Sequence, residues 1–270
     1  MINMKIIKHY FIYITFFFKD INKMNVFVCV IGIITIIFII ILIILLVRHK
    51  LECFEGINKL DAILYINLEN RPDRKELLLN ELESVNTNME KVQKVNGVFI
   101  PKNGHKGCVQ SHIIALKLIK MNKWNNVLIL EDDAEINIDP KIFNQIIEKA
   151  INILDKNDPD WNVIMLATVN KDSTHAYDLH DNPKLRLERL HRATTSSAYI
   201  IKNSYVDKLL TLFEHCNENM SPYNLSGDNH EYWALDQKWI QLQEQDNWYS
   251  FSTDLIKQRN IWSTIMQSHK

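Results

Sequence analysis

Three consecutive carboxylates follow a run of apolar residues in the segment LILEDDAEI, residues 128–136. Because like charges repel and raise one another's pKa values, such a cluster either spreads into solvent or holds a cation. Side chains alternate along an extended chain, so Glu131 and Asp133 should point to one side and Asp132 to the other. Two carboxylates on one side predict ligands for a hard divalent cation. The alternative is a solvated loop after an ordinary strand.

The segments around these acids alternate between strand-like and helix-like patterns. We predict strands at 61–68, 91–100, 126–133, 161–167 and 196–201, helices at 72–85 and 107–121, and helices capped by Asp139 and Asn203. This alternation predicts an α/β fold with a mostly parallel central sheet flanked by helices. Ligands gather at the carboxyl ends of the strands in such sheets, so the acids lie where a site is expected.

A long uncharged run near the start, Val26 to Val47, has the length and composition of a transmembrane helix. We therefore predict a single-pass membrane protein with a short N-terminal segment (1–25), an anchor in the lipid bilayer (26–47), a stem (48–60) and a body (61–270). The excess of lysine before the run favours a lumenal body. A cleaved signal peptide and a buried soluble helix are the alternatives.

Net charge and cysteine content narrow the classes of protein. The formal net charge of -1 does not favour a nucleic-acid partner. The four cysteines contain no C-x-x-C pair, so they indicate neither a zinc site nor a disulfide framework. We interpret them as small buried or idle thiols.

Several stretches of the body, taken in order, resemble a known family. They are YINLENRPDRKE, GHKGCVQSHIIALKLI, LILEDDA, TTSSAYIIKNSYVDKLL, ALDQKW and LIKQRNIWSTI, within about Ala62 to Ile265. Together they resemble glycosyltransferase family 25, which includes bacterial lipopolysaccharide sugar transferases and procollagen galactosyltransferases. The resemblance implies a nucleotide-diphosphosugar transferase of the GT-A type, with a UDP-sugar donor and a divalent metal, Mn²⁺ by expectation.

The resemblance also implies roles for individual residues. It makes Glu131 and Asp133 the metal ligands, and it places nucleotide-sugar binding at Asn67, Arg71, Asp73, Arg74, Ser111, His112 and Asp132. Arginine forks suit phosphate, but both arginines could equally be solvated surface charges, and the histidine could be a hydrogen-bonded core residue. The base that removes the acceptor's proton is expected to be Asp236 first and Asp228 second. For Asp236, a helix-start residue is the alternative.

These observations predict a membrane-anchored, metal-dependent glycosyltransferase. It would transfer a hexose, galactose or glucose, from a UDP-sugar to a hydroxyl of a glycan or protein, such as a collagen-like hydroxylysine, with inversion. Two rivals stay open: a catalytically inactive glycan-binding or adhesion protein on the same fold, and a hydrolase that releases UDP and free sugar. The segment WNVIMLA, residues 161–167, motivates the first rival, because family members often have W-D-x-I-x-L-G there.

Overall fold

The computed structural model describes residues 32–42, 55–179, 185–221 and 231–260, together with the backbone of β11 (Trp262–Ser263) and β12 (Ser268–His269). Contacts divide the chain into two compact units, Met1–Cys53 and Phe54–Lys270. In the first unit, the described residues form a helix at 32–42. No helix in the described part of the chain combines the length and apolar character needed to cross a membrane. The rest of the predicted anchor, 26–31 and 43–47, lies outside the described residues.

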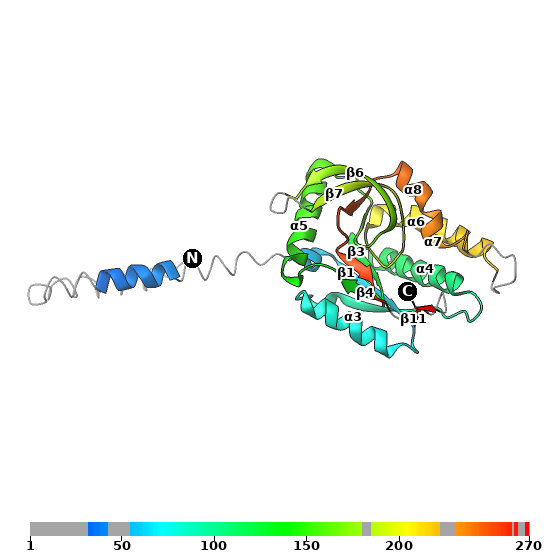
Figure 1. Ribbon diagram of the computed structural model, residues 1–270, viewed down its shortest axis with the longest axis horizontal. Coiled ribbons are helices and arrows are strands. Elements are labelled where there is room, and N and C mark those ends of the chain that lie inside the picture. The colour runs from blue at the N-terminus through cyan, green and yellow to red at the C-terminus, as the bar shows by residue number, and fades with distance from the viewer. Residues whose placement is uncertain are drawn as a thin grey trace, which may run out of the picture. The chain divides into compact units, whose positions relative to one another are not determined.

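The second unit is built on an eight-stranded sheet in the order β2-β1-β3-β8-β5-β9-β7-β6. Figure 1 labels β1, β3, β6 and β7 of this sheet. Its strands are β1 (Ala62–Asn67), β2 (Val92–Asn96), β3 (Asn126–Glu131), β5 (Val163–Met165), β6 (Val169–Asp178), β7 (Arg186–Thr194), β8 (Ala198–Lys202) and β9 (Trp248–Phe251). Strand β1 pairs parallel with β2 and β3, and β5 pairs parallel with β9. Four of the seven pairings are antiparallel, because β7 and β8 run against the other strands. Six of the eight strands share one direction, and in this sense the expected mostly parallel sheet is confirmed.

Helices cover both faces of this sheet. One face packs against α3 (Pro72–Ser84) and α5 (Pro140–Asn157), and the other against α4 (Gly104–Asn122), α6 (Asn203–Asn219) and α8 (Ile240–Gln245). In β1, Ile63 and Tyr65 join the first core, whereas Ala62 and Leu64 join the second. Because both faces are buried, the central strands are continuously apolar and do not alternate with polar residues. The α/β class predicted from the sequence is confirmed.

Short elements complete the second unit. They are η2 (Gly56–Lys59), η3 (Met89–Lys91), α7 (Leu235–Lys238), and the antiparallel pairs β4 (Ala134–Ile136) with β10 (Ile256–Gln258) and β11 with β12. The segment η2 falls in the predicted stem, yet Ile57 and Leu60 are fully buried in the core. The backbone N–H of Ile57 donates to Asn144 Oδ1 on α5 at 3.1 Å. The body therefore begins before the predicted boundary at residue 61.

Of the two helix caps predicted from the sequence, one is observed and the other is not. Helix α5 begins after Asp139, whose Oδ1 accepts a hydrogen bond from the backbone N–H of Lys141 at 3.0 Å, as predicted. The predicted cap at Asn203 is wrong, because that residue is already the first residue of α6. Its side-chain amide instead donates to the carbonyl of Trp124 at 2.6 Å. This bond ties the start of α6 to the loop before β3.

Candidate active site

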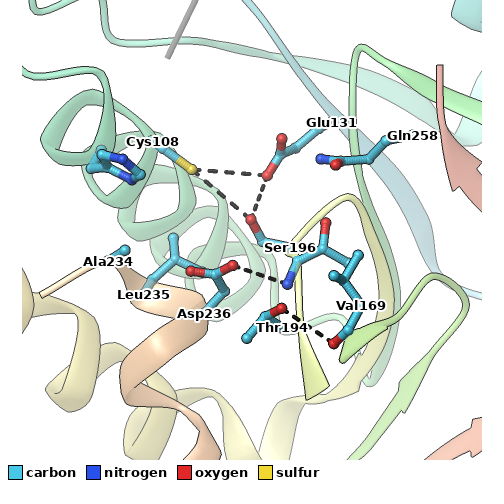
Figure 2. Close-up of a pocket in the computed structure, with 11 residues that line it drawn as sticks. Cys108, Glu131, Val169, Thr194, Ser196, Ala234, Leu235, Asp236 and Gln258 are labelled. Atoms are coloured by element: carbon cyan, nitrogen blue, oxygen red, sulfur yellow. Dashed lines mark hydrogen bonds between the residues drawn. The ribbon is translucent and has the colours of Figure 1, made fainter. Parts of the chain in front are cut away.

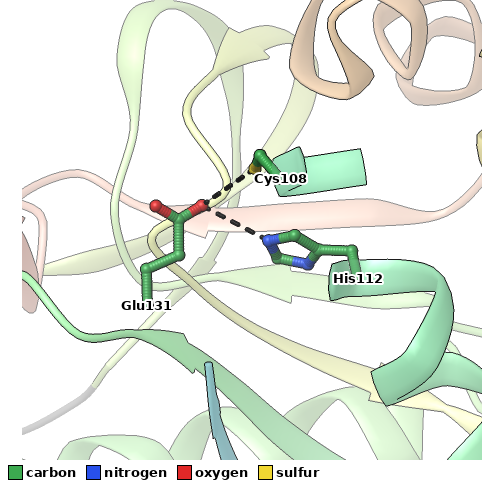
Figure 3. A group of neighbouring side chains, drawn as sticks. All are labelled: Cys108, His112 and Glu131. Carbon is green, nitrogen blue, oxygen red and sulfur yellow. Dashed lines mark hydrogen bonds and ion pairs between the residues drawn. The ribbon is translucent and has the colours of Figure 1, made fainter. Parts of the chain in front are cut away.

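Glu131, the last residue of β3, is the meeting point of the site. Its Oε1 accepts a hydrogen bond from Ser196 Oγ and lies 3.8 Å from Cys108 Sγ and 3.3 Å from His112 Nε2 (Figure 3). The cysteine and the histidine stand four residues apart on α4, a spacing that puts both on one face of a helix. The carboxylate thus bridges the end of a strand, a helix face and the turn between β7 and β8.

His112 is completely buried and has a partner at each ring nitrogen. Its Nδ1 lies 2.9 Å from the hydroxyl of Tyr199 on β8, while Nε2 faces Glu131. Burial raises the pKa of Tyr199 well above its ordinary value, so the phenol keeps its proton. His112 is therefore a hydrogen-bonded core histidine, the alternative given above, and it also contacts Glu131 of the acidic cluster.

A cavity of about 200 Å³ brings Glu131 and Asp236 together, and Figure 2 shows both carboxylates among its lining residues. Asp236 lies in the first turn of α7, where its Oδ2 accepts a hydrogen bond from the backbone N–H of Thr195 at 3.0 Å. Burial raises the pKa of Asp236, the Thr195 amide opposes the rise, and the negative charge of Glu131 adds to it. We call this cavity the Asp236 cavity.

A second, smaller cavity of about 80 Å³ is also lined by Glu131. Leu68 and the half-exposed Phe99 give it an apolar wall, and Arg74 and Asp132 supply charge. Ser111, His112, Cys108 and Glu131 also line it, and the last two line the Asp236 cavity as well. We call it the Phe99 cavity. Glu131 therefore stands at the boundary of two neighbouring cavities.

Asp132 is buried in a network of its own. Its Oδ1 accepts from Arg74 Nη1 at 2.7 Å, and its Oδ2 accepts from the Asn67 side-chain amide at 2.8 Å. Burial raises the pKa of Asp132 more than the guanidinium and the amide lower it. Arg74 Nη1 also lies 3.7 Å from Asp133 Oδ2. One arginine thus binds both aspartates of the cluster.

The alternation predicted for the three acids does not extend beyond Glu131. Strand β3 ends there, and Asp132 and Asp133 form a turn before β4, so both contact Arg74 while Glu131 contacts α4. Glu131 lines both cavities, whereas Asp133 is 2% exposed and lines neither of them. Carboxylate oxygens suit a hard cation such as Mn²⁺, but the two carboxylates predicted as its ligands face different partners, Glu131 on the α4 side and Asp133 towards Arg74. The assignment of Glu131 and Asp133 as its ligands stays a prediction.

The remaining predicted residues separate into two groups. Arg71 and Asp73 pair with each other at 2.8 Å at the start of α3, and neither lines the two cavities. Ser111 lines the Phe99 cavity and fixes its wall, because its hydroxyl donates to the Gly107 carbonyl at 2.7 Å and accepts from the Val98 N–H at 2.8 Å. A Cβ on Gly107 would lie 2.4 Å from the Val98 carbonyl oxygen, so the start of α4 needs glycine there.

Two further outcomes concern residues outside these groups. Asp228, the second choice for the base, lies outside the described residues. Sequence reasoning missed Cys108, Ser196 and Tyr199 as parts of the site. The Cys108-x-x-x-His112 spacing was visible in the sequence, but the other two residues join the site only through the fold of β7 and β8.

The segment from 102 to 224 contains α4, the acidic cluster and the β7–β8 turn. These residues match the model of glycosyltransferase family 25 (LPS biosynthesis protein). The predicted family resemblance is confirmed. The match covers less than half of the chain and supports glycosyl transfer as its class of reaction. A comparison with curated proteins finds no match.

Solved structures similar to this chain include three from varied sources. A mannose-1-phosphate geranyltransferase from Thermus thermophilus is 9% identical, with a TM-score of 0.41, covering 76% of this chain and 75% of that chain. A197 from STIV is 11% identical, with a TM-score of 0.39 and coverages of 72% and 83%. A glycosyltransferase involved in the glycosylation of the major capsid of PBCV-1 is 15% identical, with a TM-score of 0.34 and coverages of 60% and 72%.

Proposed function

We propose that the protein transfers a hexose, galactose or glucose, from a UDP-sugar to a hydroxyl group of a glycan or a protein. A collagen-like hydroxylysine is one acceptor to test. The observation that carries the proposal is the Asp236 cavity, where a carboxylate from the end of β3 and one from α7 face the same space. The match to family 25 over residues 102–224 supports glycosyl transfer as the class of reaction.

The Phe99 cavity is our candidate for the nucleotide. Phe99 lines this cavity and is 53% exposed, and an aromatic ring can stack on any nucleotide base. Arg74 lines the same cavity, and an arginine fork is suited to phosphate oxygens. Because this cavity shares Cys108 and Glu131 with the Asp236 cavity, a UDP-sugar bound there would extend its sugar towards Asp236.

Asp236 is our candidate for the base. In the transfer, the acceptor oxygen forms a bond to the anomeric carbon of the sugar, the bond from that carbon to UDP breaks, and the acceptor proton passes to Asp236 Oδ1 or Oδ2. The Thr195 N–H holds the carboxylate in place, and the raised pKa of Asp236 makes it a stronger base than an exposed aspartate. Attack from the face opposite UDP would invert the anomeric centre.

The proposal includes a divalent cation, Mn²⁺, with Glu131 and Asp133 as its ligands. When bound, such a cation neutralises the charge that develops on the departing diphosphate. Glu131 supports this role because it lines both cavities, where the diphosphate and the sugar would meet. Asp132 is held by Arg74 and Asn67 and would keep the turn in place.

The test is UDP release by the full-length chain with UDP-galactose or UDP-glucose, Mn²⁺ and a panel of hydroxyl acceptors. Wild type is expected to release UDP, whereas Asp133→Ala and Asp236→Asn are not. Asp207→Asn is the matched control, because Asp207 is an exposed aspartate on α6 that pairs with Lys120. Release that ignores the acceptor would indicate a hydrolase. Glycan binding without any release would indicate the adhesion protein.

We further propose that the run Val26 to Val47 anchors the chain in a membrane with its body in the lumen. The run is uncharged throughout, and lysines precede it. Extraction at alkaline pH separates anchored from peripheral proteins, so the chain should remain with the membrane pellet. Protection of the body from added protease in sealed vesicles would support the lumenal orientation, and its digestion would contradict it.

A further inference from the structure

Three side chains of different chemistry converge beside the Asp236 cavity: a thiol, an imidazole and a carboxylate. One ligand atom from each of Cys108, His112 and Glu131 lies within 4.8 Å of the others. Figure 3 shows the three side chains directed at a common point from α4 and from the end of β3. Hard cations such as Mn²⁺ and Mg²⁺ prefer oxygen, whereas thiolate and imidazole ligands suit zinc and similar metals.

The separations agree with a tetrahedral metal centre. In a tetrahedral zinc site the metal lies about 2.3 Å from sulfur and about 2.0 Å from nitrogen and oxygen. At the tetrahedral angle these bond lengths place S about 3.5 Å from O and N about 3.3 Å from O. Cys108 Sγ lies 3.8 Å and His112 Nε2 lies 3.3 Å from Glu131 Oε1. Both separations are within a few tenths of an ångström of the tetrahedral values, and the Cys108 and His112 ligand atoms lie within 4.8 Å of each other.

The surroundings of His112 also match those of a metal ligand. A histidine that binds metal through one ring nitrogen usually donates a hydrogen bond from the other, which fixes its orientation. His112 directs Nε2 at Glu131 and places Nδ1 2.9 Å from the Tyr199 hydroxyl, which can accept such a bond. The ring packs nearly parallel to Tyr199 and edge-on to Phe213. The imidazole is therefore held in the orientation that the metal would need.

The site has access from solvent and space for a fourth ligand. Cys108 and Glu131 line both cavities, and His112 lines the Phe99 cavity. Ser196 Oγ borders the site, hydrogen-bonded to Glu131 and 4.0 Å from Cys108 Sγ. Three protein ligands with an open fourth position are typical of zinc sites that accept water or a substrate atom.

We propose that Cys108, His112 and Glu131 form a binding site for a borderline-soft transition metal, Zn²⁺ in the first instance, with water as the fourth ligand. On binding, the Cys108 thiol releases its proton to solvent and the thiolate bonds to the metal. This site does not require the proposed transfer reaction, although it shares Glu131 with the proposed Mn²⁺ ligands. One consequence rests on that reaction: Zn²⁺ would take the Glu131 carboxylate from Mn²⁺ and inhibit sugar transfer.

The experiment uses Co²⁺ as a spectroscopic probe on the metal-free, full-length chain. Wild type should develop a thiolate-to-cobalt charge-transfer band in the near ultraviolet and the visible bands of tetrahedral Co²⁺, and added Zn²⁺ should abolish both. Cys108→Ala should lose the charge-transfer band. Cys216→Ala is the matched control, because that thiol is fully buried on α6, where burial raises its pKa to about 11.

Two further variants retain all the thiols and distinguish a loss of metal binding from a loss of folding. Tyr199→Phe removes only the hydroxyl beside His112, so Co²⁺ should bind about 10–100-fold more weakly with the band retained. Glu131→Gln removes a ligand and should weaken binding more than Tyr199→Phe, with unchanged circular dichroism. The proposal is overturned if folded wild type shows no charge-transfer band, or if the band persists unchanged in Cys108→Ala.

Discussion

The acidic cluster has two sides that differ although their residues are consecutive. On the arginine side, Asp132 and Asp133 are buried against Arg74. On the cavity side, Glu131 contacts Ser196, Cys108 and His112 and shares a cavity with Asp236. The charge of Asp132 is compensated by Arg74 at 2.7 Å, whereas Glu131 lines two cavities that a ligand can enter. Adjacent carboxylates of one motif can thus serve stability and chemistry separately.

The largest effect is expected on the cavity side, from Asp236→Asn. Loss of a general base lowers turnover by about 10²–10⁴-fold, and the amide keeps the shape of the side chain and its acceptor for the Thr195 N–H. Steady-state kinetics of UDP release with saturating acceptor would measure it. The KM for the UDP-sugar should change little, because the nucleotide is proposed to bind in the other cavity. A change in KM with unchanged kcat would contradict the role of Asp236.

On the arginine side, Arg74→Ala should act on stability. Removal of one partner of a buried ion pair leaves an uncompensated charge and costs about 3–5 kcal/mol of unfolding free energy. Urea denaturation would measure this loss. The double variant with Asp132→Asn should recover part of it, because one of the two carboxylates left without Arg74 is then neutral.

Arg71→Ala is the matched control for Arg74→Ala. Arg71 also pairs with an aspartate on α3, but the side chain of Asp73 is 59% exposed. The Arg71 side chain is 18% exposed, but its partner is well solvated, and such a pair contributes about 0.2–1 kcal/mol, so this variant should lose much less stability than Arg74→Ala. Equal losses of unfolding free energy in both arginine variants would mean that the buried pair of Arg74 contributes no more to stability than the pair of Arg71.

The two cavities can be distinguished through Phe99→Ala. Loss of an aromatic face on which a base stacks costs about 1–3 kcal/mol of binding free energy. Calorimetric titration with UDP should therefore show weaker binding, while the unfolding free energy of this half-exposed site stays close to wild type. Met121→Ala, at an exposed position on α4, is the control. Unchanged UDP affinity would remove the nucleotide from the Phe99 cavity.

The sequence predicted the buried elements of the fold better than the exposed ones. Strands β1, β3 and β8 are continuous apolar runs because helices cover both faces, and this pattern can be recognised in a single sequence. The hairpin of β6 and β7 escaped prediction. In β6 every residue is at least partly exposed, so its sequence, VNKDSTHAYD, lacks an apolar face.

The site divides in the same way. Glu131 and Asp236 were found because motifs carry them, but their common cavity depends on α7 folding against the β7–β8 turn. The cysteines were interpreted through C-x-x-C spacing alone, so the pairing of Cys108 with His112 four residues later went unused. The third member of that group, Glu131, lies on another element. Side chains brought together from separate elements have no local sequence pattern.

The smallest effects concern pH and again belong to the cavity side. Burial, with Glu131 adding to it, raises the pKa of Asp236 above the ordinary value of 3.8. The base must be ionised to accept a proton, so kcat/KM should fall as the pH is lowered through this raised pKa. Glu131→Gln removes the added charge and should move the remaining acid limb to lower pH. A limb that moves to higher pH in this variant would contradict the coupling of the two carboxylates.

The contribution of Asp236 to folding stability should fall as the pH rises, whereas its contribution to kcat/KM should rise. A carboxyl group whose pKa is raised by folding contributes stability that is present below its unfolded pKa and lost as the pH rises through its folded pKa. At neutral pH the ionised Asp236 therefore costs stability, and Asp236→Asn should raise Tm slightly while it lowers turnover. On the arginine side, Asp132 also has a raised pKa, but Asp132→Asn discards its ion pair with Arg74 and leaves the guanidinium buried. A gain of Tm at Asp236 and a loss at Asp132 would therefore separate the two sides in a single thermal scan at neutral pH.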